Sequence, residues 1–122
     1  MALGMHGKLN KIRDSKARLR WLMGLPERFC WVCGRAFDGF AHAMNVHHII
    51  GASGRSDEPC NFFLAAQACH MAIHGERPVV NGKALEKVSL AEVLRLKKKH
   101  DPDNFDPERL RQLRGQALPD WE

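Results

Sequence analysis

Cysteine and histidine side chains are concentrated between residues 30 and 74, and this cluster constrains the fold more than any other feature of the chain. The 122 residues include four cysteines and seven histidines but no tyrosine. Within 45 residues the chain has a Cys-x-x-Cys pair, a His-His pair, an asparagine after a turn and a Cys-His-x-x-x-His segment. Random scatter seldom gives such spacing, whereas metal sites require it, so the sequence predicts a metal site.

The Cys-x-x-Cys pair at Cys30 and Cys33 has two interpretations. In a reducing cytosol a disulfide is disfavoured, so the pair is either a redox centre or half of a zinc site. A redox pair is expected between a strand and a following helix. Gly34, Asp38 and Gly39 follow instead, which is typical of a turn wrapped around a metal, so we expect a zinc knuckle.

The histidines divide between a predicted helix and a predicted strand. His70 and His74 are four residues apart on the helix, so both imidazoles project from one side and can share one ion. His47 and His48 are adjacent on the strand and point to opposite faces, so at most one of them joins that ion. Three neutral histidines leave an open position on a metal, and a fourth one nearby can act as a general base. The simpler alternative for the helical pair is surface decoration.

Periodicity and breaker residues predict a single α+β domain. Residues 1–26 form a basic helical arm, residues 27–77 the core with the cysteines and histidines, and residues 78–122 a helical support. The predicted elements are a helix over 10–23, a strand over 46–50 inside a hairpin over 46–64, a helix over 65–74, a turn over 78–82, a helix capped by Ser89 with Leu90, Val93, Leu94 and the Lys97 stem on one face, and a helix from Asp106 to Gly115.

The net charge of +5 and the pI near 9.3 favour a polyanionic partner. The whole excess lies in residues 1–22, where six cations accompany a single acid. This segment is either an arm that contacts nucleic acid or a solvated helix face. The candidate nucleic-acid contacts are Lys11, Arg13, Lys16, Arg18 and Arg20, with Arg55 in the hairpin tip.

Two absences in the sequence bear on location. No apolar run approaches the roughly 18 residues of a membrane span. The first residues also lack the apolar segment of a secretory signal. We therefore expect a cytoplasmic protein with no membrane partner.

The segments CWVC, VHHII and CNFFLAAQACHMAIHG resemble the HNH nucleases, also called ββα-metal or His-Me finger nucleases. The resemblance covers about two-fifths of the chain, from Cys30 to Gly75, and rests on the order and spacing of the motifs. It implies a ββα-metal core in which the catalytic metal is held by three histidines, and in which His48 is the general base. Asn61 matches the asparagine of the family name and is implied to hydrogen-bond the loop that carries the base. The implied metal ligands are His47, His70 and His74.

The resemblance also implies an activity and partners. The expected reaction is metal-dependent hydrolysis of DNA phosphodiester bonds, most simply as nicking of double-stranded DNA, to leave a 5′-phosphate and a 3′-hydroxyl. One catalytic divalent metal is expected, and imidazole ligands suit Zn, Ni or Mn better than Mg. The size resembles small free-standing HNH proteins of phages, which would act in the bacterial host cell. A homodimer that cuts both strands and a phage packaging or replication partner are left open.

A structural zinc is the second cofactor that the resemblance implies. Many HNH proteins hold it with two Cys-x-x-Cys pairs, but here Ala66 stands where the first cysteine of the second pair is expected. The implied ligands are Cys30, Cys33 and Cys69, with Cys60 as the substitute for the fourth. The alternative for Cys60 is a small buried hydrophobic residue.

Two other functions are compatible with parts of the pattern. A non-catalytic, zinc-dependent nucleic-acid-binding module would use the cysteines and histidines only to hold the fold, and it would not depend on His48. A redox protein that used Cys30 and Cys33 would leave four histidines unexplained.

Overall fold

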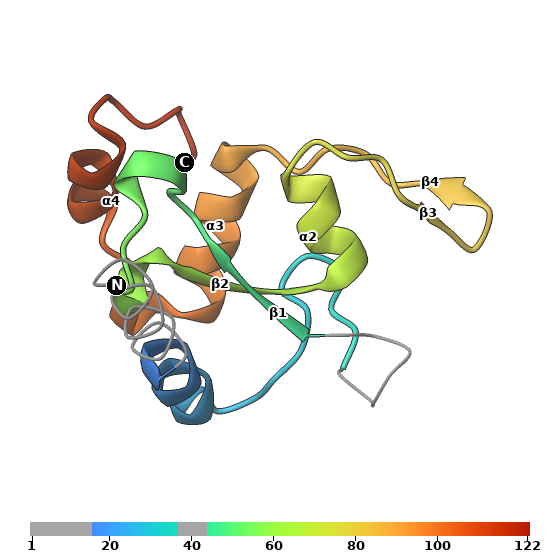
Figure 1. Cartoon of the computed structure of the whole chain (residues 1–122), viewed down its shortest axis with the longest axis horizontal. Helices are drawn as coiled ribbons and strands as arrows, with labels where there is room; N and C mark the ends of the chain where they lie inside the picture. Colours follow the sequence, from blue (N-terminus) through green and yellow to red (C-terminus); the bar gives the residue numbers. More distant parts are fainter. Residues whose placement is uncertain (1–15, 37–43) are drawn as a thin grey trace, which may run out of the picture.

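The computed structural model describes residues 16–36 and 44–122, and within these it is a small mixed α+β protein (Figure 1). Residues 16–24 are helical, so the described end of the predicted N-terminal helix is confirmed, while Lys11 and Arg13 lie outside the described residues. Two small antiparallel sheets and three further helices follow, joined by short 3-10 turns. Their bounds are β1 Met44–His48, β2 Phe62–Ala66, α2 Gln67–Ile73, β3 Val79–Val80, β4 Lys83–Ala84, α3 Leu90–His100 and α4 Pro107–Arg114.

The hairpin of β1 and β2 crosses the middle of the molecule (Figure 1). The two strands pair antiparallel from Met44 with Ala66 to His48 with Phe62, which confirms the predicted hairpin with a long tip. β2 is buried along its whole length, as expected of a strand covered on both faces. The hairpin therefore carries the predicted histidine pair on a strand whose partner is fixed in the core.

Two predicted boundaries differ from the structure. The strand predicted over 46–50 is shifted to 44–48, and Ile49 and Ile50 continue as buried residues of the tip. The helix predicted from Ala65 begins at Gln67, because Ala65 and Ala66 pair with β1. Strand pairing in a buried sheet outweighs the helix propensity of alanine here.

The two C-terminal helices are confirmed together with their caps. The Ser89 hydroxyl accepts from the Glu92 N–H at 3.2 Å, and α3 buries Val93 and Leu94 on one face. The Asp106 carboxylate accepts from the Arg109 N–H at the start of α4. Gly115, at a φ of 78°, ends α4 in the left-handed conformation that glycine adopts without cost. Within the described residues, no helix is long and apolar enough to cross a membrane.

The predicted turn over 78–82 contains a small hairpin that the sequence reading missed. Asn81 and Gly82 have φ values of 53° and 78°, which are typical of the turns that join two-residue hairpins. The β3–β4 hairpin built on this turn projects away from the body of the molecule (Figure 1).

A buried lysine joins three parts of the core. Lys97 on α3 is fully buried, and its ammonium donates to the carbonyls of Pro59 and Phe62, at 2.8 Å each. It also donates to the Asp101 carboxylate at 2.7 Å, which accepts in turn from the Trp21 indole N–H at 2.9 Å. Burial lowers the pKa of Lys97, and the hydrogen bond that its ammonium donates to Asp101 opposes that shift. The ammonium thus ties α3 and the N-terminal helix to the start of β2.

Lys97→Met is expected to lower the free energy of unfolding by about 3–5 kcal/mol, because it removes the cation that pairs with the buried Asp101 carboxylate and the donor to two buried carbonyls. Urea denaturation measures this loss. Lys99→Met is the matched control, since Lys99 is an exposed lysine of the same helix, and it should change the value by less than about 0.5 kcal/mol. An unchanged free energy of unfolding in Lys97→Met would show that the hydrogen bonds of Lys97 contribute nothing to stability.

Candidate metal centres and the loop around them

Three histidines from two elements converge on one point. His47 comes from β1, His70 from α2, and His74 caps the C-terminal end of α2 one turn after His70. One ring nitrogen from each lies within 4.8 Å of those of the other two, and the His70 and His74 Nε2 atoms are 3.0 Å apart. The predicted cluster is therefore brought together, and it can hold a metal ion.

The cluster is built for neutral imidazoles. Burial, followed by repulsion from His70 and His74, lowers the pKa of His47 to about 3. Burial also lowers the pKa of His70, and repulsion from His74 lowers it further. Neutral imidazole is the form that ligates a metal, and three of them suit a transition metal and leave a position for water or a phosphate oxygen. The donor set fits the metal that the sequence implies.

His48 lies outside this cluster, as strand alternation predicts. Its ring packs against Phe62, whereas the ring of His47 packs against Phe63. His48 Nε2 lies 2.9 Å from the Asp57 carboxylate, and the His48 side chain is 12% exposed. A carboxylate only accepts hydrogen bonds, so Nε2 carries the proton and the lone pair of the neutral ring is on Nδ1. Sequence reasoning missed Asp57, although an acid in the hairpin tip of a histidine-bearing strand was a usable signal.

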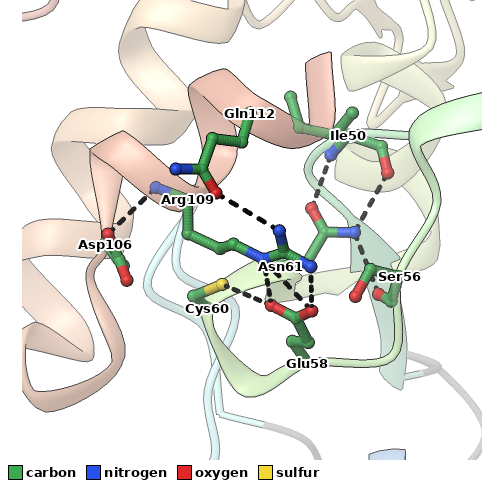
Figure 2. A network of polar contacts seen from close by, with 8 residues as sticks. All are labelled: Ile50, Ser56, Glu58, Cys60, Asn61, Asp106, Arg109 and Gln112. Carbon is green, nitrogen blue, oxygen red and sulfur yellow. Dashed lines mark hydrogen bonds and ion pairs between the residues drawn. The ribbon is translucent and has the colours of Figure 1, made fainter. Parts of the chain in front are cut away.

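Asn61 ties together the loop between the strands. Its side chain is fully buried, and its oxygen accepts from the Ile50 N–H at 2.7 Å (Figure 2). Its amide nitrogen donates to the carbonyls of Ile50 and Ser56, both at 3.0 Å. Ile50 is two residues after His48, and Ser56 directly precedes Asp57. The asparagine therefore fixes both ends of the segment that carries the base candidate and its carboxylate.

The same loop is held from outside by α4. A Cβ on Gly54 would lie 2.2 Å from the Leu113 carbonyl oxygen, so only glycine permits this approach of the loop to the helix. Arg109 forms a two-pronged ion pair with Glu58, with Nε 2.8 Å from Oε2 (Figure 2). That hydrogen-bonded pairing lowers the pKa of Glu58 to about 2. Neither contact was predicted, because each joins residues more than 50 positions apart.

Three cysteines form the second cluster. The sulfurs of Cys30, Cys33 and Cys69 lie within 4.8 Å of one another. A tight turn presents the first two, with Gly34 at a φ of 79° and the Cys30 N–H bonded to the Arg35 carbonyl at 2.9 Å. Hydrogen bonds from the Cys69 thiol and from nearby backbone N–H groups lower the pKa of Cys30 to about 5, so it is ready to bind as a thiolate. This turn matches the predicted knuckle, and the group can hold a metal such as zinc.

Cys60 is not part of this group, contrary to the prediction that it supplies the fourth ligand. It precedes β2, whereas Cys69 lies beyond the other end of that strand, and five strand residues span roughly 16 Å. Its thiol is buried and donates to the Glu58 carboxylate at 3.7 Å. Burial, aided by the charge of Glu58, raises the pKa of Cys60 to about 11. The alternative of a small buried residue describes it better.

Those predicted basic contacts that the structure describes do not line the cavity at the histidines. A cavity of about 610 Å³ is lined by His47, His48 and His74, but by none of Lys16, Arg18, Arg20 or Arg55. The helix of residues 16–24 lies away from α2 in Figure 1. Lys11 and Arg13 are outside the described residues. A role of the arm in binding stays a prediction.

The two clusters predict separate metal occupancies. Protein produced with zinc is expected to carry two ions per chain, and Cys69→Ser or His70→Ala should each remove one. Cobalt substitution distinguishes them, because only the thiolate site should give a sulfur-to-cobalt absorption band. That band should vanish in Cys69→Ser and persist in His70→Ala.

Cys60→Ser is the matched control for this measurement, and it should keep both ions. Loss of an ion from Cys60→Ser would contradict the assignment of three thiols without Cys60. If Cys69→Ser alone or His70→Ala alone lost both ions, the two sites would not be independent.

Comparison with known proteins finds no matching family model, no matching curated protein and no matching solved structure. The resemblance to HNH nucleases therefore rests on the motif residues alone.

Proposed function

We propose that this protein is a metal-dependent endonuclease that hydrolyses DNA phosphodiester bonds, with His48 as the general base. The observation that carries the proposal is one shared cavity. His47 and His74, from the three-histidine cluster, line it together with His48, which is not needed as a ligand. A purely structural metal site gives no reason for a carboxylate-bound fourth histidine beside it.

The residues of this chain have distinct parts in the proposed reaction. A divalent cation held by His47, His70 and His74 supplies charge stabilisation at the phosphate when it is bound. His48 accepts a proton from the attacking water at Nδ1, since Nε2 donates to Asp57. The negative charge of Asp57 then stabilises the imidazolium that forms, and it keeps the ring in the useful tautomer. Asn61 holds the loop so that both residues stay in place.

The products follow from the attack of water at phosphorus. Hydrolysis with departure of the 3′ oxygen leaves a 5′-phosphate and a 3′-hydroxyl, and one such centre acting alone cuts one strand. Relaxation of supercoiled plasmid to the open circle is therefore the expected primary event. Imidazole ligands favour Mn, Ni or Zn over Mg as the activating ion.

Plasmid nicking tests the proposal. Metal-stripped protein given back Mn, Ni, Zn or Mg is expected to nick supercoiled DNA, and His48→Ala should slow nicking by about 10²–10⁴-fold, because the water loses its base. His100→Gln is the matched control, as His100 packs on Phe29 and Trp31 away from the cavity. If wild type and His48→Ala bind the plasmid and neither nicks it with any metal, the non-catalytic binding module replaces the nuclease.

Asp57→Asn tests the contact that orients the base. An amide cannot stabilise the imidazolium and can donate to the ring instead, so we expect a fall of about 10–100-fold in the cleavage rate constant with unchanged DNA affinity. The readout is a single-turnover rate beside a binding isotherm. Asp103→Asn, an exposed acid of the turn before α4, is the control. An unchanged rate in Asp57→Asn would remove Asp57 from the account.

A further inference from the structure

The cavity beside the histidines is flanked by two cations that the sequence reading did not single out. Lys87 lies in the segment between β4 and α3, and Arg114 is the last residue of α4. Both line the cavity of about 610 Å³ that His48 also lines, and no acidic residue of the described parts of the chain lines it. We propose that Lys87 and Arg114 bind phosphates of the substrate strand on either side of the scissile bond. This inference rests on the proposed nuclease function and names the residues that hold its substrate.

Lys87 is positioned at the His74 side of the cavity. The Val88 N–H donates to the Ala72 carbonyl at 3.2 Å, which ties this segment to α2. The Lys87 stem passes Gly75, the residue after His74, with Cδ and Cε 3.9 Å from where a Cβ on that glycine would lie. Among residues 16–36 and 44–122, no carboxylate pairs with the Lys87 ammonium, and the side chain is exposed. An anchored, unpaired lysine beside a cluster of metal-ligand type is suited to bind an anion.

Arg114 lines the cavity at the end of α4, next to the contact of Leu113 with the loop that follows His48. The contact between Gly54 and the Leu113 carbonyl brings the last turn of α4 against that loop. Arg114 Nη1 donates to the Ala117 carbonyl at 2.5 Å, which restrains the half-buried guanidinium. One of its five N–H groups is used in this way, and a phosphate requires only two.

The floor between the two cations favours a nucleic-acid strand over a small free anion. Ile50, Val88 and Leu113 line the cavity and offer apolar surface for sugars, while Lys87 lies beside Gly75 after α2 and Arg114 follows Leu113, which contacts the loop at Gly54. A single phosphate at the histidines would not need both Lys87 and Arg114. Consecutive phosphates of one strand would contact both cations, and each neutralised phosphate releases counterions from the DNA.

Fluorescence anisotropy of a labelled DNA duplex, titrated at several salt concentrations, tests the inference. All proteins carry His48→Ala so that the probe stays intact. Lys87→Gln and Arg114→Gln are each expected to weaken binding about tenfold, and to reduce the slope of log affinity against log salt by about one. Lys87→Arg should retain the affinity. Lys83→Gln, an exposed lysine of β4 that does not line the cavity, should match the parent.

The outcomes separate this inference from the proposed function. Nicking is compared with the same substitutions made in protein that keeps His48. If wild type nicks plasmid, and Lys87→Gln both binds DNA and nicks plasmid as well as Lys83→Gln does, the phosphate contact is overturned and the nuclease stands. If wild type fails to nick with every metal, the proposed function fails, whatever the binding data give. Thermal melts monitor the folding of each variant. If Arg114→Gln is destabilised, the inference is judged from the loss of DNA affinity in Lys87→Gln and its recovery in Lys87→Arg. Equal competition by inorganic phosphate in Lys87→Gln and its parent would also count against the contact.

Discussion

The antiparallel pairing of β1 with the buried strand β2 is the constraint on which both clusters and the loop between them depend. Because side chains alternate along β1, the pairing sends His47 toward α2 and His48 toward the loop and Asp57. A slip of one residue would exchange the two and destroy both the three-histidine cluster and the contact of His48 with Asp57. The register of the pairing is fixed by β2, because Phe62, Phe63 and Leu64 are all fully buried in the core.

The second consequence of this pairing is that one short helix serves two clusters. α2 follows β2 directly and carries Cys69 and His70 at adjacent positions. Cys69 lies with Cys30 and Cys33 in one cluster, while His70 and His74 lie with His47 of β1 in the other. The loop after His48 is restrained separately, by Asn61 from within and by α4 through Gly54 and Arg109. Side chains that are brought together by differently anchored elements gain positional precision from each of those anchors.

Spacing in the sequence was enough to predict that His70 and His74 share one side of a helix with at most one histidine of the strand pair, because helical and strand periods dictate which neighbouring side chains share a face. The choice of His47, and the grouping of Cys69 with Cys30 and Cys33, came from the resemblance to HNH nucleases. Local signals also predicted the Ser89 and Asp106 caps. Contacts between distant segments could not be predicted in this way. They include the Lys97 ammonium in the core, the approach of Gly54 to α4 and the separation of Cys60 from Cys69. The contact of Asp57 with His48 is an intermediate case for prediction. The two residues are close in the sequence, but their contact depends on the shape of a loop that Asn61 fixes.

We propose that His47, His70 and His74 hold the ion at which His48 acts, so DNA cleavage should depend on metal occupancy of the three-histidine cluster. Protein with its thiol site filled and its histidine site empty is titrated with Mn or Ni, and nicking is followed beside the bound metal. The account predicts no nicking at the start, a rise in proportion to occupancy of the histidine site, and a plateau at one further ion per chain. Full activity with the histidine site empty, or none with both sites filled, would contradict it.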